Sequence, residues 1–296
     1  MPEPLVDRHF LERLERLTLH WQKSFNGLVG GRKASRFAGS GQEFLDHRNF
    51  HTGDDLRAVN WRAYMRFERF FLKTFQVEPR VPVRLLLDVS ASMAAGTLPG
   101  GVTKFDYARR LTAALIYIGL VRLDNIVLQP FAEHAHQPFF ATGGRHRFHA
   151  AESFLRELVP AGRTDFRDLS RQYLSMYSQR GFTIVLSDFL ADSDCFRPLQ
   201  YLADFGHELL IVQLWTPTDR EPAAEGEIDL IDSESGEHRK AFFDQRARRQ
   251  YVQAFDAHAE QLKRLALRNG GRYAGISVQT PIDEVLFGDL VMAVPA

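Results

Sequence analysis

The sequence predicts an α/β protein built on a doubly wound, mostly parallel β-sheet with helices on both faces. After Pro82, short aliphatic stretches alternate with longer stretches of helical character. Such alternation is typical of βαβ units, which form parallel sheets. Two aliphatic stretches, residues 83–89 and 182–189, lack polar alternation, as expected of central strands covered on both faces. Each reaches an aspartate at its carboxyl end, Asp88 and Asp188.

The sheet domain is expected to span residues 81–296. Its expected strands are residues 83–89, 125–131, 135–140, 182–189, 208–215 and 272–278. Its expected helices are residues 103–123, 147–158, 166–178, 195–204 and 244–268. Gly270 and Gly271 provide the C-terminal stop of the last helix. Residues 227–243 predict an inserted β-hairpin that turns at Ser233–Gly236.

Residues 1–80 form an N-terminal segment of different character. Apolar side chains at helical spacing predict an amphipathic helix over residues 7–24. Residues 26–55 are rich in Gly, Ser, Arg and Asn, which predicts turns and loops. Residues 69–78 alternate enough to predict a strand, and prolines then separate this strand from the sheet domain.

Composition argues against several classes of function. The 296 residues include 37 Lys and Arg and 37 Asp and Glu, so no global charge favours nucleic acid or an acidic membrane. The longest apolar run, residues 111–121, is too short to cross a bilayer and predicts a buried helix. The N-terminus lacks the pattern of a signal peptide, and the single cysteine, Cys195, fits a reducing compartment. We therefore expect a cytoplasmic protein without a membrane segment or a nucleic-acid partner.

The stretch DVSAS places one carboxylate and two hydroxyls at alternate positions, Asp88, Ser90 and Ser92. A hydrolase nucleophile is disfavoured because the glycines of a Gly-x-Ser-x-Gly elbow are missing. Helix capping is an alternative, but the next helix pattern begins near Thr103, too far along the chain for these serines to cap it. Alternate side chains of an extended loop project to one side. The three residues would therefore present hard oxygen donors of the kind that Mg²⁺ prefers.

This stretch resembles the Asp-x-Ser-x-Ser element of the metal-ion-dependent adhesion site in von Willebrand factor A-like domains, which have a Rossmann-type fold. That site also takes a threonine from a later loop and an aspartate from the end of the fourth strand. Thr164, just before an expected helix, and Asp188 match these two elements in order. The resemblance implies a single Mg²⁺ or Mn²⁺ ion. Its implied ligands are Asp88, Ser90, Ser92, Thr164 and Asp188, with the carboxylates binding directly or through water.

Residues 35–75, which precede the sheet domain, resemble the corresponding segment of the bacterial domain of unknown function 58 family. The positions that carry the resemblance are Gly41, Glu43, Phe44, Arg48, Phe50, Gly53, Asp54, Asp55, Arg57, Asn60, Trp61, Lys73 and Phe75. Phe50 stands where the family has tyrosine. Asn60 stands where the family has aspartate, which removes a carboxylate. Many members of the family carry N-terminal membrane helices, and this sequence shows none.

The resemblance implies a non-catalytic partner of a MoxR-type AAA+ ATPase that acts in chaperone-like assembly or maturation of complexes. A client protein would bind through an acidic residue that completes the coordination of the metal. Two alternatives stay open. One is a metal-dependent hydrolase of phosphoesters, although no general base or second metal cluster is apparent near Asp88. The other is a structural interaction domain whose metal site is empty.

Other polar groups have simpler explanations. Asp54 and Asp55 are expected to form a turn and pair with neighbouring arginines. Four histidines have zinc-like spacing but lack an accompanying cysteine or carboxylate, namely His134, His136, His146 and His149. Three arginines near Trp61 predict a solvated face, with contact to an acidic partner as the alternative, and they are Arg62, Arg66 and Arg69.

Overall fold

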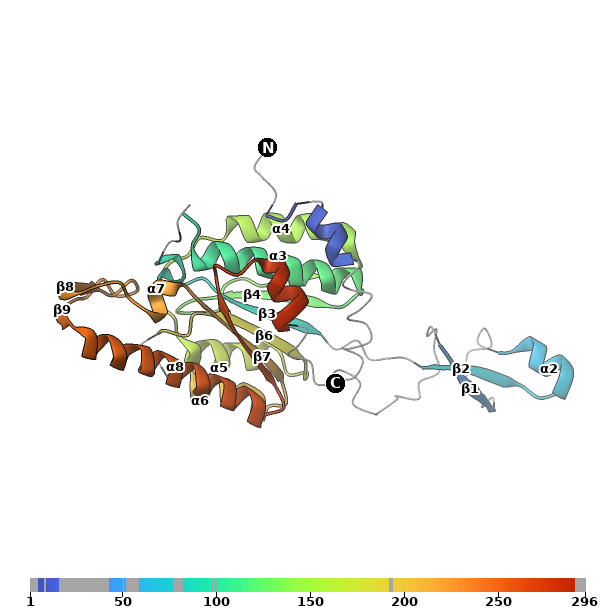
Figure 1. Cartoon of the computed structure of the whole chain (residues 1–296). Helices are drawn as coiled ribbons and strands as arrows, with labels where there is room; N and C mark the ends of the chain where they lie inside the picture. Colours follow the sequence, from blue (N-terminus) through green and yellow to red (C-terminus); the bar gives the residue numbers. More distant parts are fainter. Residues whose placement is uncertain are drawn as a thin grey trace. The chain divides into compact units, whose positions relative to one another are not determined.

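Figure 1 shows a computed structural model of the chain. The structure describes residues 5–7, 9–15, 43–49, 51, 59–76, 82–96, 98, 101–191 and 194–290. The chain divides into two compact units, one formed by Met1–Phe25 with Val81–Ala296 and the other by Asn26–Arg80. Among the described residues, no helix is both long and apolar enough to cross a membrane.

The larger unit contains a six-stranded sheet with the strand order β10-β7-β6-β3-β4-β5. Its strands are β3 (Val83–Asp88), β4 (Ile126–Phe131), β5 (Phe139–Ala141), β6 (Phe182–Ser187), β7 (Glu208–Trp215) and β10 (Arg272–Ser277). All neighbouring strands run parallel except β5, which is antiparallel to β4. The chain first builds outward from β3 through β4 and then returns to β6 on the other side of β3. The predicted doubly wound α/β sheet is confirmed, and its strand order reverses between β3 and β6.

Helices cover both faces of this sheet (Figure 1). One face carries α3 (Lys104–Val121) and α4 (Phe148–Glu157). The opposite face carries α5 (Phe166–Met176), α6 (Phe196–Asp204) and α8 (Gln245–Arg268). Most of α3 is buried, because it packs between the sheet and α4. This burial explains why its sequence is apolar on nearly every side.

The central strands are buried along nearly their whole length, as their aliphatic sequences predict. Every residue of β4 and β6 is buried. Several polar side chains within this sheet are hydrogen-bonded, as buried polar groups generally are. The hydroxyls of Thr183 and Tyr173 are 2.8 Å apart, and Tyr273 donates to the side-chain oxygen of Gln213 at 2.6 Å.

Helix boundaries follow from capping side chains. Thr103 and Asp106 form a reciprocal capping box that starts α3. Asp165 caps α5 by accepting from the backbone N–H groups of Arg167 and Asp168. The carboxyl end of α8 is closed by Gly270, which has a φ of +70° that L side chains rarely adopt.

The strand β5 and the helix α7 differ from the sequence expectation. The strand expected at residues 135–140 begins only at Phe139, because Pro138 has no N–H for the ladder. The short helix α7 (Pro217–Arg220) lies between β7 and the inserted hairpin and was not expected. A capping box between Thr216 and Asp219 holds it, and this places Asp219 beside the carboxyl ends of the strands.

The inserted hairpin is confirmed. It consists of β8 (Gly226–Ile231) and β9 (His238–Phe243), which pair antiparallel to each other and join no other sheet among the described strands. Its turn contains residues 232–237, as expected from the sequence. The hairpin therefore projects from the domain without contributing to the central sheet.

Residues 9–15 are helical, Asp7 precedes the helix, and residues 16–24 of the expected helix lie outside the described residues. This short helix contacts the larger unit through side chains. Glu15 accepts a hydrogen bond from the Tyr117 hydroxyl at 2.5 Å, and Arg145 pairs with the same carboxylate at 2.9 Å. Arg13 pairs with Asp283.

The smaller unit contains β1 (Glu43–Asn49), α2 (Trp61–Phe67) and β2 (Phe71–Gln76). β1 and β2 form an antiparallel pair. The expectation of loops throughout residues 26–55 is wrong for β1, because a β-ladder partner distant in sequence overrides its weak local pattern. Asn60 caps α2 by accepting from the N–H of Ala63 at 3.4 Å. An amide oxygen performs this role without the carboxylate that the family pattern has there.

The two glycines after α8 provide a test of close packing at the edge of the sheet. A Cβ at Gly271 would lie 2.4 Å from the backbone oxygen of Leu209, whereas one at Gly270 would meet nothing within 4 Å. We expect Gly271→Ala to lower the free energy of unfolding by at least about 3 kcal/mol, because β7 and β10 must separate. Gly270→Ala should cost about 1–2 kcal/mol through its left-handed backbone alone. Chemical denaturation of the two variants measures both values, and equal losses would contradict the proposed clash.

Candidate metal centre

Asp88 is the last residue of β3 and is completely buried. Its carboxylate accepts hydrogen bonds from neighbouring loop and strand groups. The N–H of Ser90 donates to Oδ1 at 2.9 Å, and the Ser187 hydroxyl donates to Oδ2 at 2.5 Å. The hydroxyl of Thr164 lies 3.3 Å from Oδ2. The parallel pairing of β3 with β6 brings Ser187 to this position.

The two serines after Asp88 lie at the start of a short 3₁₀ helix, Ala91–Ala94. Their hydroxyl oxygens are 3.0 Å apart, and both residues are buried. Ser90 occupies the N-cap position of this helix, but its side chain makes no capping hydrogen bond. Its hydroxyl therefore faces Ser92 within the cluster rather than the backbone of the helix.

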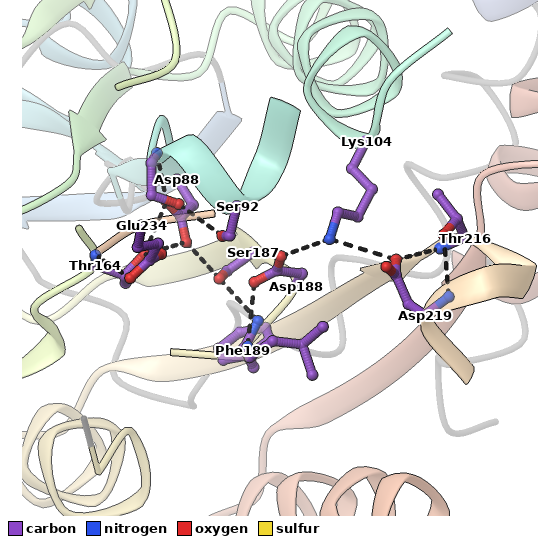
Figure 2. A network of polar contacts seen from close by, with 12 residues as sticks. Asp88, Ser92, Lys104, Thr164, Ser187, Asp188, Phe189, Thr216, Asp219 and Glu234 are labelled. Carbon is purple, nitrogen blue, oxygen red and sulfur yellow. Dashed lines mark hydrogen bonds and ion pairs between the residues drawn. The ribbon is translucent and has the colours of Figure 1, made fainter. Parts of the chain in front are cut away.

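Thr164 comes from the loop between α4 and α5 and is also buried. Asp165, the next residue, fixes this loop by capping α5. Thr164 thereby approaches Asp88 from a segment far away in the sequence (Figure 2).

Asp188 follows β6 and is likewise buried. Its Oδ1 accepts from the N–H of Leu190 at 3.1 Å, and its Oδ2 lies 2.7 Å from the ammonium of Lys104. The same ammonium lies 3.3 Å from Asp219 of α7. Figure 2 shows Lys104 between the two carboxylates. Lys104 is itself buried, and the sequence analysis did not identify it because its partners come from separate loops.

The electrostatics of the cluster are unbalanced around Asp88. Burial raises the pKa of Asp88 to about 7, and the negative charge of Asp188 adds to this rise, while hydrogen bonds from Ser187 and Ser90 oppose it. Burial alone would lower the pKa of Lys104, but the charges of Asp188 and Asp219 outweigh it and the net pKa is raised. Lys104 therefore compensates Asp188 and Asp219, whereas Asp88 is held by neutral donors.

Three aromatic side chains near these carboxylates pack against one another. The rings of Phe166 and Phe189 stack with their centroids 5.4 Å apart, and Phe131 lies 5.6 Å from Phe166. Two of these residues are neighbours of the carboxylates. Phe131 of β4 pairs with Asp88 of β3, and Phe189 directly follows Asp188 in the sequence. All three rings are buried, as is Asp88, and burial disfavours the charged form of its carboxylate.

Glu234, in the turn of the inserted hairpin, also reaches the cluster. Its Oε1 accepts from the Thr164 hydroxyl at 3.0 Å, and its Oε2 accepts from the Thr164 N–H at 3.1 Å. Sequence reasoning found the hairpin but not this contact. The available signal was the acidic turn DSESGE, which by itself is typical of any exposed hairpin.

A cavity of about 180 Å³ opens beside the cluster. It lies between the carboxyl ends of the strands and the hairpin turn. The lining residues are Ser92, Ala95, Lys104, Asp188, Leu190, Asp219, Asp232, Ser233 and Glu234. Its position matches the crevice in which doubly wound sheets bind ligands, at the edge where strand order reverses.

The donor set fits a hard divalent cation. Asp88, Ser90, Ser92, Thr164 and Asp188 all lie at this edge and offer only oxygen atoms. Within the described residues, no three His, Cys, Asp or Glu side chains gather in a way that would hold a metal. A cation at this edge would therefore depend on the hydroxyls as well as on the carboxylates. The buried Asp88, without a basic partner here, is the group that most requires a positive charge.

The other polar groups considered from sequence do not build a site. His134 pairs with Asp168 at 2.8 Å, and His149 lies 4.0 Å from Glu152. All four histidines of the zinc-like set are exposed. Cys195 is buried, and burial raises the pKa of its thiol to about 12. The expected turn at Asp54 and Asp55 lies outside the described residues.

Comparison with known proteins gives both relatives and structural neighbours. The chain matches the family described as "Protein of unknown function DUF58" over residues 46–261. "Uncharacterized protein Rv1480" of Mycobacterium tuberculosis (strain ATCC 25618 / H37Rv) is 27% identical over 257 residues, which cover 85% of this chain and 79% of that protein. "Uncharacterized protein Mb1516" of Mycobacterium bovis has the same identity and coverage.

Three solved structures are similar to this chain at low sequence identity. An aerotolerance-related membrane protein from Bacteroides fragilis NCTC 9343 is 15% identical, with a TM-score of 0.46 over 72% of this chain and 98% of that one. BatB from Bacteroides thetaiotaomicron is 15% identical, with a TM-score of 0.44 over 72% and 97%. Proximal thread matrix protein 1 from the mussel byssus, with a zinc-occupied MIDAS motif, is 10% identical, with a TM-score of 0.45 over 72% and 47%.

The sheet order, the helices on both faces and the polar cluster at the carboxyl edge define a doubly wound α/β protein with a candidate site in the crevice typical of this fold. The family match covers well over half of the chain. This chain belongs to the DUF58 family, as the resemblance of residues 35–75 indicates.

Removal of the buried ammonium tests its role in the cluster. Lys104→Met should lower the free energy of unfolding by about 3–5 kcal/mol, because Asp188 would lose its buried counter-charge. As a matched control, Arg264→Met removes an exposed pair with Glu260 on α8 and should cost about 1 kcal/mol or less. Urea denaturation at neutral pH compares the two. A loss for Lys104→Met as small as that of the control would contradict a compensating role for Lys104.

Proposed function

We propose that this protein is a non-catalytic module that binds other proteins through a divalent cation, Mg²⁺ or Mn²⁺. The observation that supports this function best is the convergence of five oxygen donors beside an open cavity, around a buried Asp88 that has no basic partner among the described residues. Ser90, Ser92 and Thr164 would hold the cation through their hydroxyls. Asp88 and Asp188 would hold it directly or through water.

The residues of the chain prepare this site in three ways. The parallel strands fix the two carboxylates at one edge. Lys104 compensates Asp188 and Asp219, so that the site is not overloaded with negative charge. The neighbouring aromatic rings are buried, and the cavity gives the cluster an open side. When bound, the cation would supply an electrophilic point that attracts an acidic side chain of a client protein.

The proposed partner is a MoxR-type AAA+ ATPase, with a role in chaperone-like assembly or maturation of complexes. Membership of the DUF58 family supports this partner, through what the family resemblance implies. The proposed setting is the cytoplasm, where ATP is available to such an ATPase. A phosphoesterase receives less support, because the described residues contain no cluster of three His, Cys, Asp or Glu side chains of the kind that holds the metal ions of such enzymes.

Metal binding is tested by thermal unfolding of chelator-treated protein. Mg²⁺ or Mn²⁺ at about 100 times its Kd should stabilise the wild type by about 2.7 kcal/mol, because the folded state alone has the site. Asp88→Asn and Ser90→Ala should lose this stabilisation. Asp256→Asn, which alters an exposed carboxylate on α8, should retain it. Equal stabilisation of wild type and Asp88→Asn would contradict the assigned site.

Partner binding is tested with a MoxR-type ATPase from the same genome. We expect a complex in the presence of Mg²⁺ that is lost with EDTA, because the cation would bridge the two proteins. Ser90→Ala should abolish the complex while Asp256→Asn leaves it intact. Biolayer interferometry with the immobilised protein measures both. A complex that persists unchanged in EDTA and in Ser90→Ala would contradict metal-dependent binding of this partner.

A further inference from the structure

The turn of the inserted hairpin is built to hold one side chain in a fixed place. Asp232 accepts hydrogen bonds from the N–H of Glu234 at 2.8 Å and from the N–H and hydroxyl of Ser235 at 3.3 and 2.7 Å. The backbone closes the turn, with Gly236 N–H donating to the carbonyl of Asp232 at 2.8 Å. These bonds orient Glu234 toward the carboxyl edge of the sheet.

Glu234 contacts the candidate metal centre through one residue. Both of its carboxylate oxygens accept hydrogen bonds from Thr164, one from the hydroxyl and one from the backbone N–H. Figure 2 shows its carboxylate beside Thr164 and Asp88. Among the described residues, no lysine or arginine forms an ion pair with Glu234. An acidic side chain is thus placed against an already acidic site, an arrangement that a cation would favour.

Glu234 lies at the cavity through which a client carboxylate would approach the cluster. The cavity opens between the strand ends and the hairpin turn, and Glu234 itself lines it. Thr164 is one of the expected metal ligands, and Glu234 is a carboxylate that both lines the cavity and bonds to this ligand. The hairpin strands pair only with each other among the described strands, so the turn can withdraw without breaking the central sheet.

We propose that Glu234 is an internal ligand, which occupies the acidic-residue position of the metal centre until a client replaces it. This proposal rests on the proposed function, since it assumes a cation at the carboxyl edge. A client must then compete with Glu234, and its apparent affinity is lowered by the fraction of molecules in which the turn is bound. The hairpin thereby raises the client concentration that is needed for binding.

The test uses Mn²⁺, whose bound water molecules accelerate the relaxation of water protons. Glu234→Ala is compared with Glu237→Ala, which removes the same charge from the same turn but lies outside the cavity. Isothermal titration first measures the Kd of Mn²⁺ for each full-length protein. Water-proton relaxation of the Mn²⁺-loaded proteins then reports the water bound to the ion, with and without added acetate as a carboxylate probe.

We expect the relaxation enhancement to rise in Glu234→Ala, through a gain of one bound water, and to stay unchanged in Glu237→Ala. Acetate should reverse the rise in Glu234→Ala and have no effect on the wild type. Hydrogen exchange of the Thr164 amide should also become faster in Glu234→Ala. Normal Mn²⁺ binding with identical relaxation in wild type and Glu234→Ala would overturn the internal ligand while leaving the metal site intact. Absence of Mn²⁺ binding to both the wild type and Glu234→Ala would overturn the metal site and the internal ligand together.

Discussion

The parallel pairing of β3 with β4 and β6 is the constraint on which the candidate site depends. Parallel strands end at the same edge of a sheet, so a residue that terminates one strand lies beside those that terminate its neighbours. Asp88 ends β3, and Ser187 and Asp188 end β6. Burial of both strands on two faces leaves these polar groups only their own edge to occupy. The loop that follows β3 then adds the hydroxyls of Ser90 and Ser92 to this edge.

Charge is the second determinant of this edge. Buried carboxylates are costly unless a cation or hydrogen-bond donors compensate them. Here the compensation is divided, because Lys104 serves Asp188 and Asp219 while neutral donors serve Asp88. A site of this kind keeps one carboxylate in a position where a divalent cation would be stabilising. The same unbalanced charge is a cost to the folded protein in the absence of such a cation.

The inserted hairpin adds a feature that the sheet alone would not have. It separates α7 from α8 in the sequence, yet its turn returns to the carboxyl edge and contacts the loop before α5. Two segments from opposite parts of the domain therefore meet at Thr164. In an interaction module, a change in the position of the hairpin would therefore alter the contacts of Thr164 at the binding site.

The sequence by itself determined the fold class and singled out five residues that meet at the carboxyl edge of the sheet. Periodicity located the strands that carry Asp88 and Asp188, since continuous aliphatic runs leave few alternatives to buried parallel strands. Family-like spacing singled out Ser90, Ser92 and Thr164. Tertiary structure alone decided the roles of Lys104, Ser187, Asp219 and Glu234, and it revealed β1, whose local sequence predicts a loop. The physical reason is common to these cases: each depends on a partner distant in the chain, and local pattern carries no information about which distant groups the sheet will bring together.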